Sequence, residues 1–444
     1  MTALVHRAAP PADLLVRGAR VLDPREGLDA PLDVLVRGGQ VALLGAPGSL
    51  DADGAELVDG EGRCLVPAFV DPHVHLRTPG QEHKEDLETG TRAAAAGGFC
   101  AVLAMPNTAP VVDSAPVLGA LLDQAAREAR VPVGFLAAIT RGQEGRQLTE
   151  MAELADLGAL GFTDDGRPVA DAGVLRRALQ YQRLAGGVVT LHEEDPTLSG
   201  PGAMHEGAVS ARLGLAGIPS VSETTMVARD CGLAEHEGAR IHVQHLSAAG
   251  SVAAVAAAKA RGVRVSAEVT PHHLTLTHED VASLDTALKM NPPLREEADR
   301  RALVEALRDG TVDCVATDHA PHARDEKEVP FEQAPMGTTG LETAFAALHT
   351  MLVVPGVLPL GLVIERLSAG AALFGLPVPR IAPGAPADLA LLELDARWTV
   401  GERGYESRSA NSCFAGRPLV GRAVLTVAAG GVAYRERGFA LSAL

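Results

Sequence analysis

The sequence is poor in aromatic residues and in positive charge. Phe, Trp and Tyr together make up 3% of the 444 residues, with a single tryptophan, so we do not expect a surface that binds nucleic acid by base stacking. The formal net charge is −17, and no basic stretch compensates it. Nucleic acid and anionic membranes are therefore not expected partners. No apolar run reaches the roughly 18 residues of a membrane-spanning helix.

Cysteine is also scarce. The five cysteines are odd in number and widely spaced, and no C-x-x-C pair occurs: Cys64, Cys100, Cys231, Cys314 and Cys413. This pattern argues against a disulfide framework and against a thiolate metal site, and favours a reducing compartment. Residues 1–13 contain two prolines and no long apolar run, which is unlike a signal peptide. We therefore expect a cytoplasmic protein.

The length allows one large domain and a smaller one. At both ends the sequence shows short β-like runs, at 14–22, 33–44, 387–394 and 421–434. The middle differs, because eight short apolar runs alternate there with stretches rich in Ala, Leu, Glu and Arg. Helical patterns are clearest at 85–96, 114–129 and 170–184.

The eight apolar runs lie around residues 65–71, 100–105, 133–140, 159–163, 188–191, 241–244, 264–269 and 312–317. Eight strand–helix alternations over about 270 residues predict an α/β fold, a (β/α)8 TIM barrel, whose usual size is about 250 residues. A doubly wound open sheet is the alternative. That fold usually shows a glycine-rich phosphate turn after its first strand, and none occurs here.

Polar residues follow most of these runs at the point where each predicted strand ends: His73 and His75 after the first, Asn107 after the second, Asp164 and Asp165 after the fourth, His192 after the fifth, His245 after the sixth and Asp318 after the eighth. In a barrel, these strand ends form the face that carries the active site. His73 and His75 are two residues apart, so both point to the same side of a strand. Four imidazoles with carboxylates and no thiolate favour zinc or a similar divalent ion at a catalytic site.

A second metal ion about 3.5–4 Å from the first would need a bridging anion. In several related barrels a carboxylated lysine is the bridge, but no lysine lies between Lys84 and Lys259. A carboxylate after the fourth strand must then be the bridging anion. Asp164 and Asp165 compete for this role, since alternating strand geometry turns only one of them inward. The other would cap a helix or support the site.

Further residues at the same face suggest a small substrate with a free carboxylate. Asp318 is suited to bind the metal weakly and to carry a proton to the leaving nitrogen; helix capping is its alternative role. Arg77 and Asn107 are suited to hold a carboxylate. We predict substrate contacts at Arg77, Asn107, Asn291, His322, Pro335 and Gly337. For Asn291 and for the glycine-rich loop with Pro335 and Gly337, a plain turn is an equally good explanation.

These motifs resemble those of class I dihydroorotases, in the amidohydrolase superfamily. The stretches that carry the resemblance are 71–86, 104–113, 291–295, 317–322 and 334–343. The resemblance extends from about residue 14 to 433. The H-x-H pair alone would indicate only the wider superfamily, whereas the motifs together are specific.

The resemblance implies six metal ligands: His73, His75, Asp165, His192, His245 and Asp318. The family's spacing of 27 residues between the aspartate and the strand-five histidine selects Asp165 over Asp164. It implies substrate binding by Arg77, Asn107, Asn291 and His322. Family members also carry a small β-sandwich domain built from both termini. We accordingly assign residues 1–63 and 380–444 to this domain and residues 64–379 to the barrel.

The activity implied is that of a dihydroorotase, which reversibly cyclises N-carbamoyl-L-aspartate to L-dihydroorotate and water in de novo pyrimidine biosynthesis. The expected cofactor is Zn²⁺, one or two ions per subunit, with Asp318 as the catalytic proton carrier. We also expect a homodimer, with aspartate transcarbamoylase as a candidate partner. The nearest alternative is an allantoinase or hydantoinase, against which the missing bridging lysine and the Arg77 and Asn107 pair argue. A non-catalytic scaffold is disfavoured because every ligand position is filled.

Overall fold

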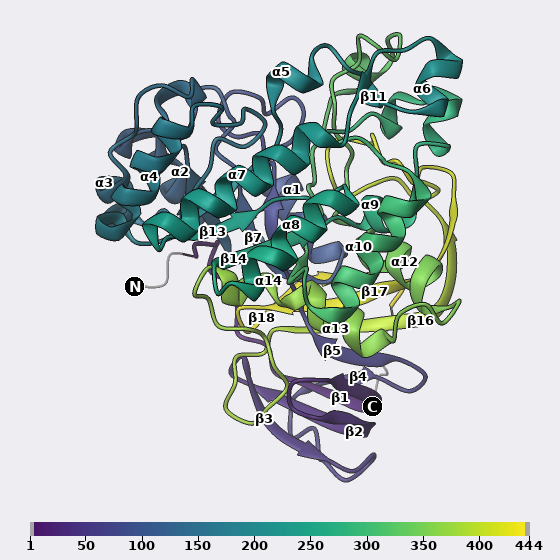
Figure 1. The fold of residues 1–444 in the computed structure, drawn as a ribbon. Coiled ribbons are helices and arrows are strands. Elements are labelled where there is room, and N and C mark those ends of the chain that lie inside the picture. The colour runs from purple at the N-terminus through teal and green to yellow at the C-terminus, as the bar shows by residue number, and fades with distance from the viewer. Residues whose placement is uncertain (1–3, 440–444) are drawn as a thin grey trace.

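The computed structural model describes residues 4–439. Figure 1 shows two parts: a group of helices around a central set of strands, and a strand-rich region below it that contains the first strands of the chain. Among residues 4–439, no helix is long and apolar enough to cross a membrane.

The central part is an eight-stranded parallel barrel. Its strands follow one another in sequence order: β6 (Phe69–Val74), β7 (Phe99–Ala104), β8 (Val133–Ala137), β9 (Gly161–Phe162), β10 (Val188–Leu191), β13 (Arg240–Val243), β14 (Arg264–Val269) and β15 (Cys314–Val315). A parallel bridge between Val74 and His319 joins the first strand to the segment after the last. Each predicted apolar run overlaps one of these strands, so the barrel prediction is confirmed.

The first predicted run, 65–71, covers parts of two strands. β5 (Cys64–Pro67) belongs to the second sheet, whereas β6 opens the barrel. The change of sheet occurs between two adjacent residues: the amide of Ala68 donates to Asp388 of the second sheet (3.0 Å), and that of Phe69 donates to Gly98 of the barrel (2.9 Å). Both strands are fully buried, which explains why the pattern of apolar residues does not separate them.

Helices alternate with the barrel strands. The main ones are α1 (Leu87–Ala96), α2 (Ala115–Glu128), α3 (Met151–Leu157), α4 (Ala172–Ala185), α7 (Val221–Glu237), α8 (Ala249–Ala260), α10 (Glu297–Asp309), α13 (Leu360–Ser368) and α14 (Gly370–Leu373). The three predicted helical stretches correspond to α1, α2 and α4. Asp86 and Asp171 cap α1 and α4 by accepting hydrogen bonds from backbone amides of the first turn.

Shorter elements occur in the connections at the carboxyl ends of the strands. They are α5 (Pro196–Ser199), β11 (Met204–His205), α6 (Ala208–Leu213), β12 (Gly217–Ile218), α9 (Pro271–Thr275), α11 (Arg324–Lys327) and α12 (Ala344–Leu348), with 3-10 turns at Arg141–Gln143, Asp280–Ser283 and Thr286–Leu288 and a π turn at His349–Val353. The long connections build the walls of the active-site face.

The second sheet is formed by both ends of the chain. It contains β1 (Leu14–Asp23), β2 (Leu28–Arg37), β3 (Gln40–Gly45), β4 (Glu56–Asp59), β5, β16 (Leu389–Thr399), β17 (Pro418–Ala428) and β18 (Gly431–Arg435). β5 pairs with β1 on one side and with β16 on the other. The strands that we expected in a sandwich are therefore hydrogen-bonded as one continuous sheet, because β5 joins the N-terminal strands to the C-terminal ones.

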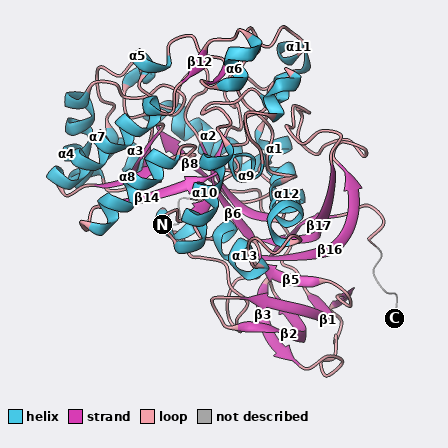
Figure 2. Ribbon diagram, turned by 45° about the vertical axis from the view of Figure 1, so that its right-hand side comes forward, coloured by secondary structure: helices cyan, strands magenta, loops and turns pink. Residues whose placement is uncertain are grey.

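The second sheet also contacts the barrel. Figure 2 shows β16 and β17 as long, curved strands that pass beside α12, and β17 contacts both α1 and α12. Between β16 and β17 the chain leaves the sheet in a connection, residues 400–417, that reaches the active-site face. A loop of the terminal sheet therefore contributes to the barrel's functional end.

Candidate metal centre

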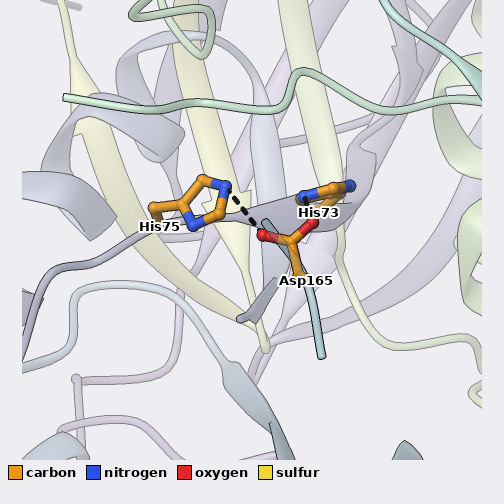
Figure 3. Close-up of side chains that lie close together, drawn as sticks. All are labelled: His73, His75 and Asp165. Carbon is orange, nitrogen blue, oxygen red and sulfur yellow. Dashed lines mark ion pairs between the residues drawn. The ribbon is translucent and has the colours of Figure 1, made fainter. Parts of the chain in front are cut away.

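Six polar side chains meet at the carboxyl ends of the barrel strands. His73 lies in β6 and His75 directly follows it, while the other four follow β9, β10, β13 and β15: Asp165, His192, His245 and Asp318. All six are buried. Figure 3 shows His73, His75 and Asp165 turned toward one another. The structure thus brings together every residue that we predicted as a metal ligand.

Asp165 lies between two groups of imidazoles. Its Oδ1 is 3.4 Å from His73 Nε2, and its Oδ2 is 3.6 Å from His75 Nε2. On the other side, Oδ1 is 3.8 Å from both His192 Nδ1 and His245 Nε2. The candidate ligand atoms within each group lie no more than 4.8 Å apart. One carboxylate shared by two triads is the arrangement expected of a bridging ligand.

Asp318 completes the cluster from the last strand. Its Oδ1 lies 3.0 Å from His75 Nε2 and 3.4 Å from His73 Nε2. Its backbone has a positive φ of 47°, and Arg77 and His245 also have positive φ values. Such conformations cost about 1–3 kcal/mol each for residues other than glycine and tend to cluster at functional sites. Three of the seven described non-glycine residues with positive φ therefore belong to this one site.

The donor set fits a divalent cation. His73 Nδ1 donates to Glu268 Oε1 (2.6 Å), which leaves the lone pair of Nε2 directed at the cluster, and that buried Nε2 has no hydrogen-bond partner. Burial alone would lower the pKa of His73, but the charges of Glu268, Asp165 and Asp318 raise it well above its ordinary value. The buried carboxylates therefore need a positive charge beside them. A proton on His73 Nε2 supplies it without metal, and a divalent cation would take the place of that proton.

The structure separates Asp165 from its neighbour Asp164. The carboxylate of Asp164 accepts hydrogen bonds from the backbone amide (3.0 Å) and the hydroxyl of Thr140. Burial raises the pKa of Asp164 to about 6. Because successive side chains of an extended chain point in opposite directions, Asp164 joins the loops after β8 and β9 while Asp165 faces the cluster.

Two buried carboxylates that we did not predict hold the candidate ligands in position. Glu268, on β14, accepts from His73 and also contacts His242 Nε2 (3.0 Å). Asp71 accepts hydrogen bonds from the backbone amides of His73 and Thr317, both at 3.1 Å, and so joins the first and last strands. A signal existed for Glu268, because a charged residue between the apolar residues Ala267 and Val269 at the end of a predicted strand requires a buried partner.

A cavity of about 290 Å³ opens beside the cluster. Besides five of the six predicted ligands, its walls include Arg77, Asn107, Asn291, His322, Met336 and Gly337. Pro335 was predicted to bind substrate but does not line this cavity. Its carbonyl accepts a hydrogen bond from Lys327 Nζ (2.8 Å), so the chain turns there and presents Met336 and Gly337 instead.

Arg77 presents an anion-binding group to this cavity. Its Nε donates to the carbonyl of Pro321 (3.1 Å), and its two terminal nitrogens make no hydrogen bond to any described residue. Burial lowers the pKa of Arg77 to about 10, so the group remains a cation at neutral pH. A buried guanidinium with two unused nitrogens is suited to bind a carboxylate in bidentate fashion.

The two predicted asparagines contact the ligands. Asn107 accepts from His75 Nδ1 (2.8 Å) and donates to Asp165 Oδ2 (3.1 Å). Asn291 donates to Glu194, whose Oε2 is also 3.4 Å from His192 Nε2. Although burial raises the pKa of Glu194, the contacts with His192 and Asn291 lower it to about 2. Both amides thus orient imidazoles as well as line the cavity.

Asn411, in the connection between β16 and β17, was also missed. Its Oδ1 accepts from the amide of His322 (3.0 Å), and its Nδ2 donates to the carbonyls of Ala320 (3.1 Å) and Gly337 (3.2 Å). This single amide therefore ties together the two loops that carry His322 and Gly337. The sequence signal was a polar stretch at 407–412 between two apolar strands, which we had assigned only to the terminal domain.

A third histidine cluster, His205, His278 and Glu296, has metal-like spacing. Arg295 Nη1 donates to His205 Nδ1 (3.2 Å). The neutral imidazole must then carry its proton on Nε2, which faces Glu296 Oε1 at 3.8 Å. Because Arg295 occupies one nitrogen and the proton the other, His205 has no lone pair to offer a metal.

Comparisons with known proteins agree with this geometry. A family model described as dihydro-orotase-like matches residues 62–251. A dihydroorotase from Pelotomaculum thermopropionicum is 47% identical over 425 residues, covering 96% of this chain and 99% of the relative. One from Anaeromyxobacter dehalogenans is 48% identical over 426 residues, covering 95% and 98%.

Solved structures share the whole architecture. An L-hydantoinase (dihydropyrimidinase) from Arthrobacter aurescens superposes with a TM-score of 0.84 at 26% identity, covering 96% of each chain. A D-hydantoinase (dihydropyrimidinase) from a Thermus species gives a TM-score of 0.80 at 25% identity, covering 97% of each chain. The similarity thus includes the terminal sheet as well as the barrel.

Proposed function

The chain belongs to the dihydroorotase family of cyclic amide hydrolases, and on that basis we propose that it reversibly cyclises N-carbamoyl-L-aspartate to L-dihydroorotate and water. This reaction is a step of pyrimidine biosynthesis. The sequence resemblance to class I members supports placing the chain in that class.

Arg77 is the observation that carries the choice of substrate. L-dihydroorotate and N-carbamoyl-L-aspartate have a carboxylate beside the reacting amide, which a hydantoin or a dihydropyrimidine lacks. The buried guanidinium of Arg77 lines the same cavity as the histidine–aspartate cluster, with two nitrogens that have no partner among the described residues. A buried donor without a partner lowers affinity for any ligand that leaves it unpaired. It therefore favours substrates that bear the carboxylate.

We propose zinc as the metal, one or two ions per subunit, held by His73, His75, Asp165, His192, His245 and Asp318. When bound there, the ion would polarise the amide carbonyl and lower the pKa of a coordinated water. His73 and His75 present Nε2 because Glu268 and Asn107 hold their Nδ1 atoms. The ligands are therefore oriented before metal enters.

Asp318 is the proposed proton carrier. Its carboxylate lies in the cluster and also lines the cavity, so it can reach both the water and the substrate. In hydrolysis it takes a proton from the water that attacks the carbonyl carbon of the ring amide, and it gives this proton to the ring nitrogen as the C–N bond breaks. In cyclisation the proton moves the opposite way. Arg77, Asn107, Asn291, His322 and the backbone of Gly337 are proposed to hold the substrate.

Several expectations stay predictions. They are the division into residues 1–63 with 380–444 and residues 64–379, the cytoplasmic location, the homodimer, and association with aspartate transcarbamoylase. Size-exclusion chromatography of the chain, alone and mixed with that transferase, tests the last two.

A substrate comparison tests the activity. Purified protein with its metal content measured should turn over L-dihydroorotate faster than hydantoin, dihydrouracil or allantoin. Higher activity on any of the last three would favour the hydantoinase-type function that the structural neighbours suggest, and would overturn the substrate assignment. Anomalous scattering at the zinc edge would identify and count the ions.

A further inference from the structure

A second cavity, of about 350 Å³, lies between α1, α12 and the curved strands of the terminal sheet. None of the predicted metal ligands lines it. Its walls include Phe345, Trp398, Tyr405 and Tyr434, and we call it the aromatic cavity. Its volume is within the range of about 300–1,000 Å³ that is typical of small-molecule sites.

The concentration of aromatic rings here is unusual for this chain. The protein has one tryptophan and three tyrosines, and the tryptophan and two of the tyrosines line this one cavity. Trp398 Nε1 donates to the carbonyl of Gly421 (3.1 Å), which holds the indole ring. The hydroxyls of Tyr405 and Tyr434 make no hydrogen bond to described residues. Such walls offer ring faces for a flat ligand and polar groups to orient it.

One of the cations that line the cavity is available to bind an anion. Four arginines line it, Arg92, Arg403, Arg422 and Arg437, against three glutamates, Glu342, Glu406 and Glu436. Burial raises the pKa of Glu342 to about 7, which removes part of the negative charge. Three of the four arginines already have carboxylate partners: Arg92 pairs with Glu406 (2.8 Å), Arg403 with Glu436 (2.8 Å), and Arg422 with both Glu436 and Glu393. Arg437 lines the cavity and has no ion pair with any described residue. In a chain of net charge −17, Arg437 therefore offers this cavity a positive charge that no described carboxylate pairs with.

We propose that the aromatic cavity is a second ligand site, for a small molecule that combines a flat ring with an anionic group such as a phosphate. The rings of Trp398, Tyr405 and Tyr434 bind the flat part, and Arg437 binds the anion. The site is separate from the cavity beside the metal ligands, with which it shares no lining residue.

A chain of hydrogen bonds connects the aromatic cavity to the active site. The carboxylate of Glu342 accepts from the backbone amides of Glu406 (2.9 Å) and Ser407 (3.1 Å). The Ser407 hydroxyl donates to Glu85, whose Oε2 is 3.2 Å from His319 Nε2. His319 directly follows Asp318 in the chain. A ligand that moves Glu406 therefore changes the support of the proposed proton carrier, and this consequence rests on the proposed function.

The single tryptophan makes binding directly measurable. Trp398 is the only source of indole fluorescence, so a ligand in this cavity changes that signal without any turnover. The probes are AMP and UMP, which carry ring and phosphate, their nucleosides, which lack the anion, and inorganic phosphate, which lacks the ring. We expect saturable quenching by a nucleotide, with nucleoside and phosphate at least about tenfold weaker. No saturable change with AMP or UMP up to millimolar concentration would overturn the proposal.

Two variants test whether the nucleotide binds in the aromatic cavity. Arg437→Ala removes an exposed guanidinium and Tyr405→Leu removes a ring, and each should weaken nucleotide binding about tenfold. Arg397→Ala is the matched control, since Arg397 is exposed on β16 beside Trp398 but does not line the cavity. Equal binding by all three variants would contradict the assignment, as would quenching that follows protein concentration instead of nucleotide concentration.

The connection to the active site has its own measurement. Saturating nucleotide should change the kcat for L-dihydroorotate at least twofold, and Ser407→Ala should abolish that change while Trp398 quenching persists. If quenching occurs but kcat does not respond, the ligand site stands and the coupling is refuted. If the chain does not turn over dihydroorotate at all, the proposed function fails, yet the fluorescence result is unaffected.

Discussion

The two halves of the active-site cavity are held in different ways. In the proposed metal-binding half, the candidate ligands are supported by side chains from the barrel: Glu268 holds His73 at 2.6 Å and Asn107 holds His75 at 2.8 Å. In the substrate-binding half, support comes mainly from backbone carbonyls and from another part of the chain. Pro321 accepts from Arg77, Met336 contacts His322, and Asn411 ties the loops of His322 and Gly337 together.

This difference indicates two separable functions within one cavity. Side chains on or directly after barrel strands keep their positions without substrate, because the parallel strands and their buried partners fix them. The loops of the other half depend on a segment between β16 and β17, far away in the sequence. Changes in the first half should therefore affect metal content, and changes in the second half should affect KM while metal stays bound.

The largest effect is expected at Asp165, which both imidazole groups share. Asp165→Ala should remove the bound divalent ion and reduce activity to background, since both triads lose their common carboxylate. Metal analysis and turnover check this. Asp164→Asn is the matched control and should retain metal, because Asp164 contacts Thr140 instead of the cluster. Full metal content in Asp165→Ala would show that Asp165 is not needed to bind the metal, and would contradict its assignment to the metal-binding half.

Asp318→Asn should lower kcat by about 100-fold or more, because an amide cannot accept and return the proton. We expect most of the metal to remain, since five other ligands are unchanged. Steady-state kinetics combined with metal analysis separate these effects. Nearly normal turnover would show that another group carries the proton.

Arg77→Ala tests the substrate half and should raise KM for L-dihydroorotate by about 10- to 100-fold, the value of a charge-assisted hydrogen bond to a carboxylate. Metal content should be unchanged. Arg77→Lys keeps the charge but not the bidentate geometry. Its KM should therefore lie between that of the unchanged protein and that of Arg77→Ala. Loss of metal without a change in KM would show that Arg77 supports the metal site and does not bind the substrate.

Glu268→Gln tests the metal-binding half of the cavity without changing a candidate ligand. A neutral amide holds His73 Nδ1 less strongly, so metal affinity should fall about tenfold. KM at saturating zinc should stay near that of the unchanged protein. Competition with a chelator measures the affinity, and an altered KM with normal affinity would be the contrary result.

The smallest effect is expected for Asn411→Ala, which loses the contacts to His322, Ala320 and Gly337. We expect KM to rise several-fold with little change in metal content, because each lost hydrogen bond contributes about 1 kcal/mol. Asn411→Asp keeps the acceptor for the His322 amide but not the donor, and should recover part of the loss. If metal is lost instead, the two halves are not independent.

Much of this molecule was predictable because its signals are local. The eight apolar runs and the histidines after them follow from strand periodicity, and a barrel necessarily gathers the strand ends at one face. The sequence predicted the barrel and all six residues of the cluster. The chemistry of the residues did not decide whether Asp164 or Asp165 faces the cluster. Only the 27-residue spacing between aspartate and histidine in related proteins selected Asp165.

The remaining features required the tertiary structure. Glu268 acts from a different strand and Asn411 from a different sheet, so no short-range pattern links either residue to the site. Of the two residues predicted from the glycine-rich loop, Gly337 lines the cavity and Pro335 does not, whereas the unpredicted Met336 does, because the sequence of such a loop does not reveal which residue faces a cavity. The aromatic cavity unites α1, α12 and the C-terminal strands of the terminal sheet, β16, β17 and β18. Sequence alone thus determined the elements and the candidate ligands they carry, except for the choice between Asp164 and Asp165, whereas long-range hydrogen bonds and packing decided what supports them.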